Sequence, residues 1–152
     1  MGRRAIFLSV ACTAFGFAAG IYAASGPRMI VTPSDSIVYQ PVDPARPAGA
    51  QIAVLRGDPA SGPSSMLMKF GKGAGPMHIH SSDYDLVVLE GEMKHWDASE
   101  DAATAKVLGP GSYWFQPGNQ PHGDDCLSDE CVMYVQWAGK RDGRAVESAG
   151  AK

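Results

Sequence analysis

The sequence has no internal repeat and no amphipathic pattern long enough to predict a helical domain. Basic residues are scarce as well: the 152 residues include 13 Lys and Arg against 16 Asp and Glu, a formal net charge of −3. A domain with this balance lacks the basic surface that nucleic-acid binding requires, so we expect no nucleic-acid partner. The length suits one domain. What remains as a structural signal is short apolar segments separated by glycine and proline.

Long apolar runs are absent except at the N-terminus. Residues 5–24 carry no charge, follow Arg3 and Arg4, and end in small residues, which is the composition of a secretory signal peptide. We therefore predict a signal peptide over residues 1–24 and a periplasmic or secreted protein. An uncleaved anchor is the alternative, because about 20 apolar residues can span a bilayer, and only then would the chain contact a membrane.

Cysteine is also rare, with three residues in the chain. Two of them, Cys126 and Cys131, lie beyond the predicted signal peptide. In an exported protein such a pair is interpreted first as a disulfide. We expect the bridge to close a hairpin whose turn is formed by residues 127–130. A thiolate that binds metal or acts as a nucleophile is the alternative interpretation.

Turn signals divide the rest of the chain into short strands. Residues 25–50 contain several prolines, which remove backbone donors, and we expect an extended lead-in there. Short strands separated by Gly/Pro turns predict an all-β sandwich or barrel over residues 51–138, followed by a flexible tail over residues 139–152. The clearest strand candidates are residues 52–55, 66–70, 113–116 and 131–137.

Histidine is scarce too, and two of the four histidines are only two residues apart. In an extended strand alternate side chains share a face, so the rings of His78 and His80 would point to the same side. Two such rings can reach one metal ion. The apolar run Leu86–Leu89 favours a strand, whereas in a helix residues two apart point in different directions.

Two segments of the chain together resemble the two motifs of the cupin superfamily. The first family motif is G-x5-H-x-H-x3-4-E-x6-G and the second is G-x5-P-x-G-x2-H-x3-N. The matching residues are His78, His80 and Gly91 in the first, and Gly111, Pro117 and His122 in the second. The resemblance implies an all-β, cupin-type double-stranded β-helix, a jelly-roll barrel. It also implies one divalent transition metal (Fe, Mn, Ni, Cu or Zn) bound by the three histidines, and pairing of chains into a homodimer.

The acidic position of the first motif is occupied by Tyr84, between Asp83 and Asp85. Tyrosine has a high unperturbed pKa, which argues against a phenolate ligand. Strict alternation would point Asp85 away from the histidines. We therefore predict Asp83 as the fourth protein ligand, with a three-histidine site completed by water as the equal alternative. If Tyr84 points inward, it is the candidate catalytic proton donor.

Metal coordination inside a barrel with apolar walls predicts a metalloenzyme acting on a small molecule. A dioxygenase, an oxidoreductase of cupin type, is the leading reaction class. A non-catalytic periplasmic cupin that binds or senses a metal or ligand is the alternative, and a jelly roll without metal is the third. Met66, Met68 and Phe70 form either plain core or a substrate wall. His95 fits no motif position, and we expect it at the surface or between the sheets.

Overall fold

The computed structural model describes residues 28–146; residues 1–27 and 147–152 lie outside this range. The signal peptide predicted over residues 1–24 therefore lies outside the described residues. The chain divides into two units, and the fold presented here is that of the second, which begins at Thr32. Among residues 28–146, no helix combines the length and apolar character that crossing a membrane requires.

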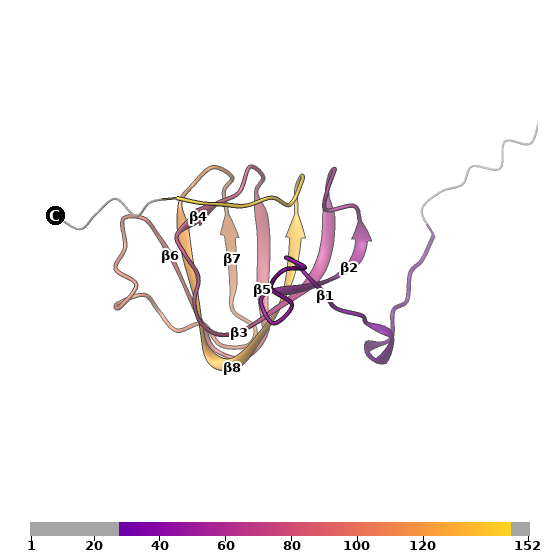
Figure 1. Ribbon diagram of the computed structural model, residues 1–152, viewed down its shortest axis with the longest axis horizontal. Coiled ribbons are helices and arrows are strands. Elements are labelled where there is room, and N and C mark those ends of the chain that lie inside the picture. The colour runs from indigo at the N-terminus through magenta and orange to yellow at the C-terminus, as the bar shows by residue number, and fades with distance from the viewer. Residues whose placement is uncertain (1–27, 147–152) are drawn as a thin grey trace, which may run out of the picture. The chain divides into compact units, whose positions relative to one another are not determined.

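The described residues form nine strands in one curled antiparallel sheet (Figure 1). The strands are β1 (Gln40–Pro41), β2 (Gln51–Gly57), β3 (Ser64–Ala74), β4 (His78–Ile79), β5 (Tyr84–Glu90), β6 (Met93–Asp97), β7 (Tyr113–Gln116), β8 (His122–Trp137) and β9 (Arg144–Ala145). A short 3-10 helix, η1 (Ser34–Ser36), precedes them. The predicted all-β jelly roll is confirmed.

The long strand β8 organises the sheet. Along one edge it pairs with β3 over most of its length. Along the other edge it pairs with β6 in its first part and with β5 in its last part. Its first residue, His122, also pairs with His78 of β4. Because β8 joins strands from both layers of the jelly roll, it brings the two histidine segments together.

A bulge interrupts the middle of β8. The register with β3 shifts between Gly71, which pairs with Glu130, and Gly73, which pairs with Cys126. The predicted disulfide between Cys126 and Cys131 is present and spans this bulge. The expectation that the bridge closes a hairpin is wrong, because both cysteines belong to one continuous strand. The bridge therefore fixes an irregularity within β8.

The interior is built by alternation of side chains along the strands. In β5, Tyr84, Leu86 and Val88 are buried while the residues between them are more exposed. In β8 the alternate residues that follow the bulge point inward in the same way. The core cluster consists of Met66, Tyr84, Leu86, Val88, Met93, Trp114, Cys126, Cys131, Met133, Val135 and Trp137.

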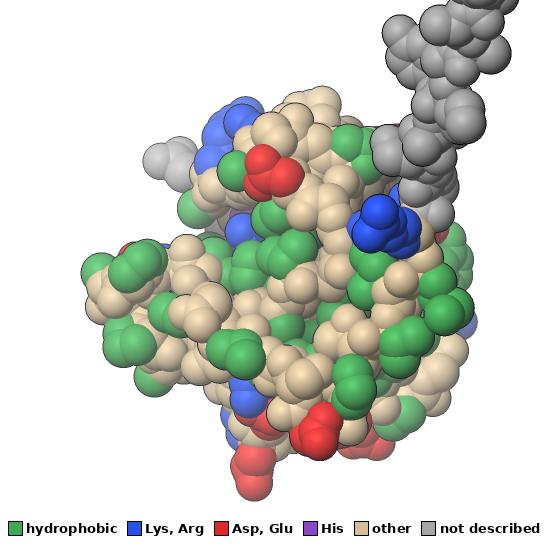
Figure 2. Space-filling model, turned by 90° about the vertical axis from the view of Figure 1, so that its right-hand side faces the viewer, with side chains coloured by type: hydrophobic (Ala, Val, Ile, Leu, Met, Phe, Trp, Pro, Cys, Tyr) green, Lys and Arg blue, Asp and Glu red, His purple; other side chains and the backbone are tan. Residues whose placement is uncertain are grey.

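Apolar side chains also remain on the outside, where hydrophobic residues are spread over the face that Figure 2 turns to the viewer. In β7, Trp114 and Gln116 point inward, and the same alternation leaves Tyr113 and Phe115 exposed. Exposed apolar residues of this kind are normal on a soluble domain. The homodimer stays a prediction.

Two segments differ from the sequence expectation, and both differences position the site. The histidine segment is not one strand, because β4 ends at Ile79 and β5 begins at Tyr84. Residues 139–146, expected within the flexible tail, contain β9, which pairs with β4 through Arg144 and Ile79.

Asn119 stands at the position where the second motif has glycine. Its φ of 61° is the left-handed conformation that glycine adopts readily and that asparagine also tolerates.

Candidate metal centre

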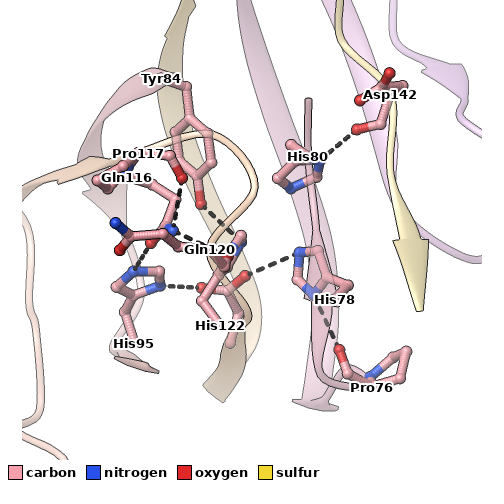
Figure 3. Close-up of polar contacts among 11 residues, drawn as sticks. Pro76, His78, His80, Tyr84, His95, Gln116, Pro117, Gln120, His122 and Asp142 are labelled. Carbon is pink, nitrogen blue, oxygen red and sulfur yellow. Dashed lines mark hydrogen bonds and ion pairs between the residues drawn. The ribbon is translucent and has the colours of Figure 1, made fainter. Parts of the chain in front are cut away.

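Three histidines meet where β4 and β8 pair (Figure 3). His78 lies in β4, His80 follows the end of that strand, and His122 opens β8. One ligand atom from each residue lies within 4.8 Å of the others. The ring centroids of His78 and His122 are 4.3 Å apart. The structure thus brings together the three histidines that the two motifs single out.

Each of these rings is oriented by a backbone carbonyl group. The Nδ1 atom of His78 is 2.9 Å from the Pro76 carbonyl oxygen, that of His122 is 3.0 Å from Gln120, and that of His80 contacts Asp142. A carbonyl oxygen only accepts hydrogen bonds, so Nδ1 carries the proton and Nε2 keeps its lone pair. Metal-binding histidines are oriented in this way. The donor set therefore fits one transition metal ion.

Burial favours the neutral form of two of these rings, those of His80 and His122. It is the largest cause that lowers the pKa of His80, to about 4, and the positive charges of neighbouring groups act in the same direction. Burial likewise lowers the pKa of His122. Because a metal binds the neutral imidazole, these two ligands need not lose a proton at neutral pH.

Asp83 does not lie with the histidines. Its carboxylate accepts a hydrogen bond of 2.7 Å from the backbone N–H of Gly118. In the part of the chain that the structure describes, the group of converging ligand atoms contains histidines alone. This placement does not support Asp83 as a fourth ligand; the residue instead ties the start of β5 to the turn before His122. The side chain of Asp85 points away from the histidines, as expected, and accepts a hydrogen bond from the hydroxyl group of Tyr113.

A different carboxylate, Asp124, lies beside the cluster. Its Oδ2 atom is 3.7 Å from Nε2 of His78, and its Oδ1 atom is 2.7 Å from Nδ1 of His95. Burial opposes ionisation of Asp124, but the hydrogen bond from His95 and the interactions with His95, His122 and His78 together outweigh it, so the pKa of Asp124 is lowered. Asp124 follows His122 by two residues in a strand, so the alternation that pairs His78 with His80 could have identified it.

His95 lies within β6, and its ring packs against side chains of two other strands. Its ring stacks on Trp114 with a centroid distance of 4.6 Å and an interplanar angle of 15°. It also contacts Asp124 of β8 and Gln116 of β7. His95 thus links three strands next to the cluster without contributing to it.

Tyr84 points into the same space as the histidines (Figure 3). Its side chain is buried, and its hydroxyl oxygen lies 3.3 Å from Nε2 of His122. Burial, assisted by the charge of Asp124, raises its pKa above the ordinary value of 10.0. Tyr84 is therefore a neutral phenol that can donate a proton or a hydrogen bond, which argues against a phenolate ligand.

A cavity of about 610 Å³ opens onto the cluster, a volume that suits a small molecule. His78, His80 and Tyr84 lie on its wall. Most of the remaining wall is apolar and includes Met68, Phe70, Leu86, Trp114, Met133, Val135 and Trp137. Met66 is fully buried in the core. The predicted methionine face is therefore divided, with Met66 in the core and Met68 and Phe70 on the cavity wall.

Comparison with known proteins identifies a family and a fold. Residues 23–142 match the family described as a domain of unknown function, DUF4437. No curated protein matches the chain. The solved structures of KdgF from Halomonas sp. and of an RmlC-like cupin from Shewanella frigidimarina NCIMB 400 are similar, with TM-scores of 0.60 and 0.59 and identities of 21% and 19%. Each match covers 76% of this chain, with 97% of KdgF and 95% of the Shewanella protein.

A third similar structure is that of the polyketide cyclase RemF from Streptomyces resistomycificus, with a TM-score of 0.61 and 21% identity. The match covers 79% of this chain and 87% of RemF. At such identities the similarity shows a shared fold. That fold carries enzymes, as the name of RemF states.

Proposed function

The chain belongs to the DUF4437 family and has the cupin fold, and on this basis we propose that it is a metal-dependent enzyme acting on a small molecule. The observation that carries the proposal is the arrangement of His78, His80 and His122. Their Nδ1 atoms face carbonyl oxygens, their Nε2 atoms are left to bind a cation, and the cluster opens into an apolar cavity.

One divalent ion held by the three Nε2 atoms would supply a Lewis acid or, if the ion is redox-active, a centre for oxygen chemistry. Fe, Mn, Ni, Cu and Zn all suit imidazole ligands. The surrounding side chains have separate tasks. The apolar wall excludes water from the reacting molecule, and Tyr84 holds a proton on its hydroxyl group beside His122.

Within this proposal, we assign a dioxygenase-like reaction, that of an oxidoreductase. Three neutral ligands leave coordination positions for other molecules, and the mostly apolar wall of the cavity suits an apolar substrate. Tyr84 is the proposed catalytic residue, as the donor to an oxygen atom of the substrate. The name of RemF, a cyclase, indicates that the same fold also supports reactions of other classes.

A non-catalytic cupin that binds or senses a metal or ligand is the second candidate. One observation favours it: the carboxylate next to the cluster, Asp124, is engaged by His95 and is not free to act as a general base.

Both candidates are proposed to work in the periplasm or outside the cell. The disulfide between Cys126 and Cys131 supports an oxidising compartment.

Metal analysis of protein purified from its native compartment tests the proposal. We expect the wild-type protein to contain a divalent transition metal and His122→Ala to lose it. Tyr84→Phe is the matched control in the same cavity, because a phenol that is not a ligand can be removed without loss of metal. Full metal retention in His122→Ala would contradict the site.

Oxygen uptake then separates the two candidates. Redox-active iron together with oxygen consumption in the presence of a substrate screen would support the dioxygenase. Tightly held zinc without turnover would support the binding protein.

A further inference from the structure

Arg141 places a positive charge on the cavity wall. Its side chain is half-buried and lines the same cavity as His78 and His80. The backbone N–H of Arg141 donates a hydrogen bond of 2.8 Å to the carbonyl of Pro59, which anchors this part of the chain to the loop after β2. The residue is therefore held at the site by its backbone.

In the described part of the chain, no acidic side chain forms an ion pair with this guanidinium group. The Nε atom of Arg141 is buried without a hydrogen-bond partner among residues 28–146, and none of the ion pairs there includes Arg141. Burial lowers its pKa from the ordinary 12.5, and the charge of Asp142 opposes this change. A half-buried cation has lost part of its hydration, and its buried Nε–H has no acceptor, so the arrangement favours an anion in the cavity.

The two carboxylates nearest to the cavity are already engaged. Asp142 accepts hydrogen bonds of 2.8 Å from both the backbone N–H and the hydroxyl group of Ser81, and it lies 3.3 Å from Lys140. Asp124 accepts its hydrogen bond from His95. Both carboxylates thus have other hydrogen-bond partners and neither forms an ion pair with Arg141, which leaves its guanidinium group available to a bound anion.

We propose that the substrate is an apolar small molecule that carries a carboxylate, and that Arg141 binds this carboxylate. This inference rests on the proposed function, in which the cavity is the substrate site. The guanidinium fork matches a carboxylate with two parallel hydrogen bonds. The apolar body of the substrate lies along the wall that includes Met68, Phe70 and Trp137.

A phosphate group fits this cavity less well than a carboxylate. A phosphate carries more charge and needs several donors. The cavity has one half-buried guanidinium, while the other cationic residue on its wall, Lys72, is exposed. A single guanidinium group with two parallel N–H donors, on a wall that is otherwise mostly apolar, matches a molecule that has an apolar body and one carboxylate.

A pair of probes that differ in charge tests the inference. The probes are 3-phenylpropionate and its neutral amide, 3-phenylpropionamide, and binding is followed by tryptophan fluorescence, since Trp114 and Trp137 line the cavity. We expect the metal-loaded protein to bind the carboxylate roughly ten- to a hundredfold more tightly than the amide, as for a hydrogen-bonded charge. Equal binding of the two probes, or binding of neither, would overturn the inference.

Variants then assign the preference to Arg141. Arg141→Gln is expected to remove the preference for the carboxylate, and Arg141→Lys to keep part of it, because a lysine retains the charge without the fork. Arg144→Gln is the matched control, since Arg144 is exposed on β9. A carboxylate preference that survives in Arg141→Gln would place the anion site elsewhere.

Metal content measured on the same samples separates this inference from the proposed function. Bound metal without a carboxylate preference would refute the anion site alone. A preference that depends on Arg141 in a protein that binds no metal would refute the metalloenzyme alone.

Discussion

His95 donates hydrogen bonds to Asp124 and Gln116 at the same time. Its Nδ1 atom is 2.7 Å from Oδ1 of Asp124 and its Nε2 atom is 3.0 Å from Oε1 of Gln116. The Gln116 amide is oriented by its own NH₂ group, which donates to the carbonyl oxygens of Pro117 and Gln120. Both ring nitrogens therefore face acceptors. The hydrogen-bonded pair of Asp124 and His95 thus lies beside the three histidines, with the centroids of the His95 and His122 rings 5.3 Å apart.

We predict that Asp124→Ala lowers the free energy of unfolding by about 3 kcal/mol, because the change leaves the His95 ring without its charged partner. Adding His95→Leu to the Asp124→Ala protein should lower the free energy of unfolding much less than His95→Leu does in the wild-type protein, since the two side chains act together. Urea unfolding of the four metal-free proteins measures the coupling. Strictly additive losses would mean that the two residues contribute independently.

Stability of the metal-free protein should fall as the pH drops from 6.5 toward about 4, the ordinary and the folded pKa of His80. In this window the unfolded chain binds a proton that the folded chain does not, so the loss is at most about 1.4 kcal/mol per pH unit for this ring. His122, whose pKa is also lowered, acts in the same direction.

Urea unfolding across this pH range checks the prediction, with His80→Gln expected to reduce the slope. Hydrogen bonds from Ser81 lower the pKa of Asp142 to about 2. The stability that this carboxylate contributes is therefore lost only at pH values below the range in which His80 acts, where the carboxylate becomes protonated. A stability that stays constant down to about 4 would contradict burial of His80 as a neutral ring.

Removal of the disulfide should destabilise the domain. The bridge links cysteines five residues apart, and a loop of this size contributes about 2 kcal/mol in the chain-entropy model. The double variant Cys126→Ala/Cys131→Ala is expected to lose at least that amount of unfolding free energy, because its buried sulfur atoms are removed as well. The wild-type protein unfolded under reducing conditions is the control. An unchanged denaturation midpoint in both samples would contradict the prediction.

Gly123, next to His122, should tolerate no side chain. A Cβ atom at this position would lie 2.5 Å from the ring of Trp96, so the ring would have to move. We predict that Gly123→Ala costs about 1–3 kcal/mol of unfolding free energy, the range for overpacking a core. Gly109→Ala is the control, because a Cβ atom there has no neighbour within 4 Å. Equal stability of the two variants would show that Trp96 adapts at little cost.

Local patterns in the sequence predict short strands, and alternation places His78 and His80 on one face. His122 joins them in the prediction only through the resemblance to the second cupin motif, and the strand that begins at His122 is longer than the predicted one over residues 131–137. The partnership of His95 with Asp124 depends on the register between β6 and β8, in which these two residues pair directly. Register between distant strands is set by the assembled sheet, so it is not visible in either segment alone.

The same limit explains the error in the disulfide topology and the placement of Asp83. The hairpin was expected because residues 127–130 resemble a turn, but pairing of β8 with β3 on both sides of the bulge keeps the strand continuous. Asp83 lies next to the histidine segment in sequence. Its carboxylate is instead taken by a backbone N–H of a turn 35 residues away.

The pairing of β9 with β4 brings a C-terminal segment to the histidine site. Two properties of the proposed site, metal binding and substrate selection, therefore depend on different segments. The three histidines come from residues 78–122, whereas the carbonyl that orients His80 and the guanidinium on the cavity wall both come from residues 141–142. The proposed metal ligands and the proposed substrate contact thus come from different segments of the chain. Substitutions near the C-terminus offer a route to new selectivity that leaves the ion's own ligands untouched.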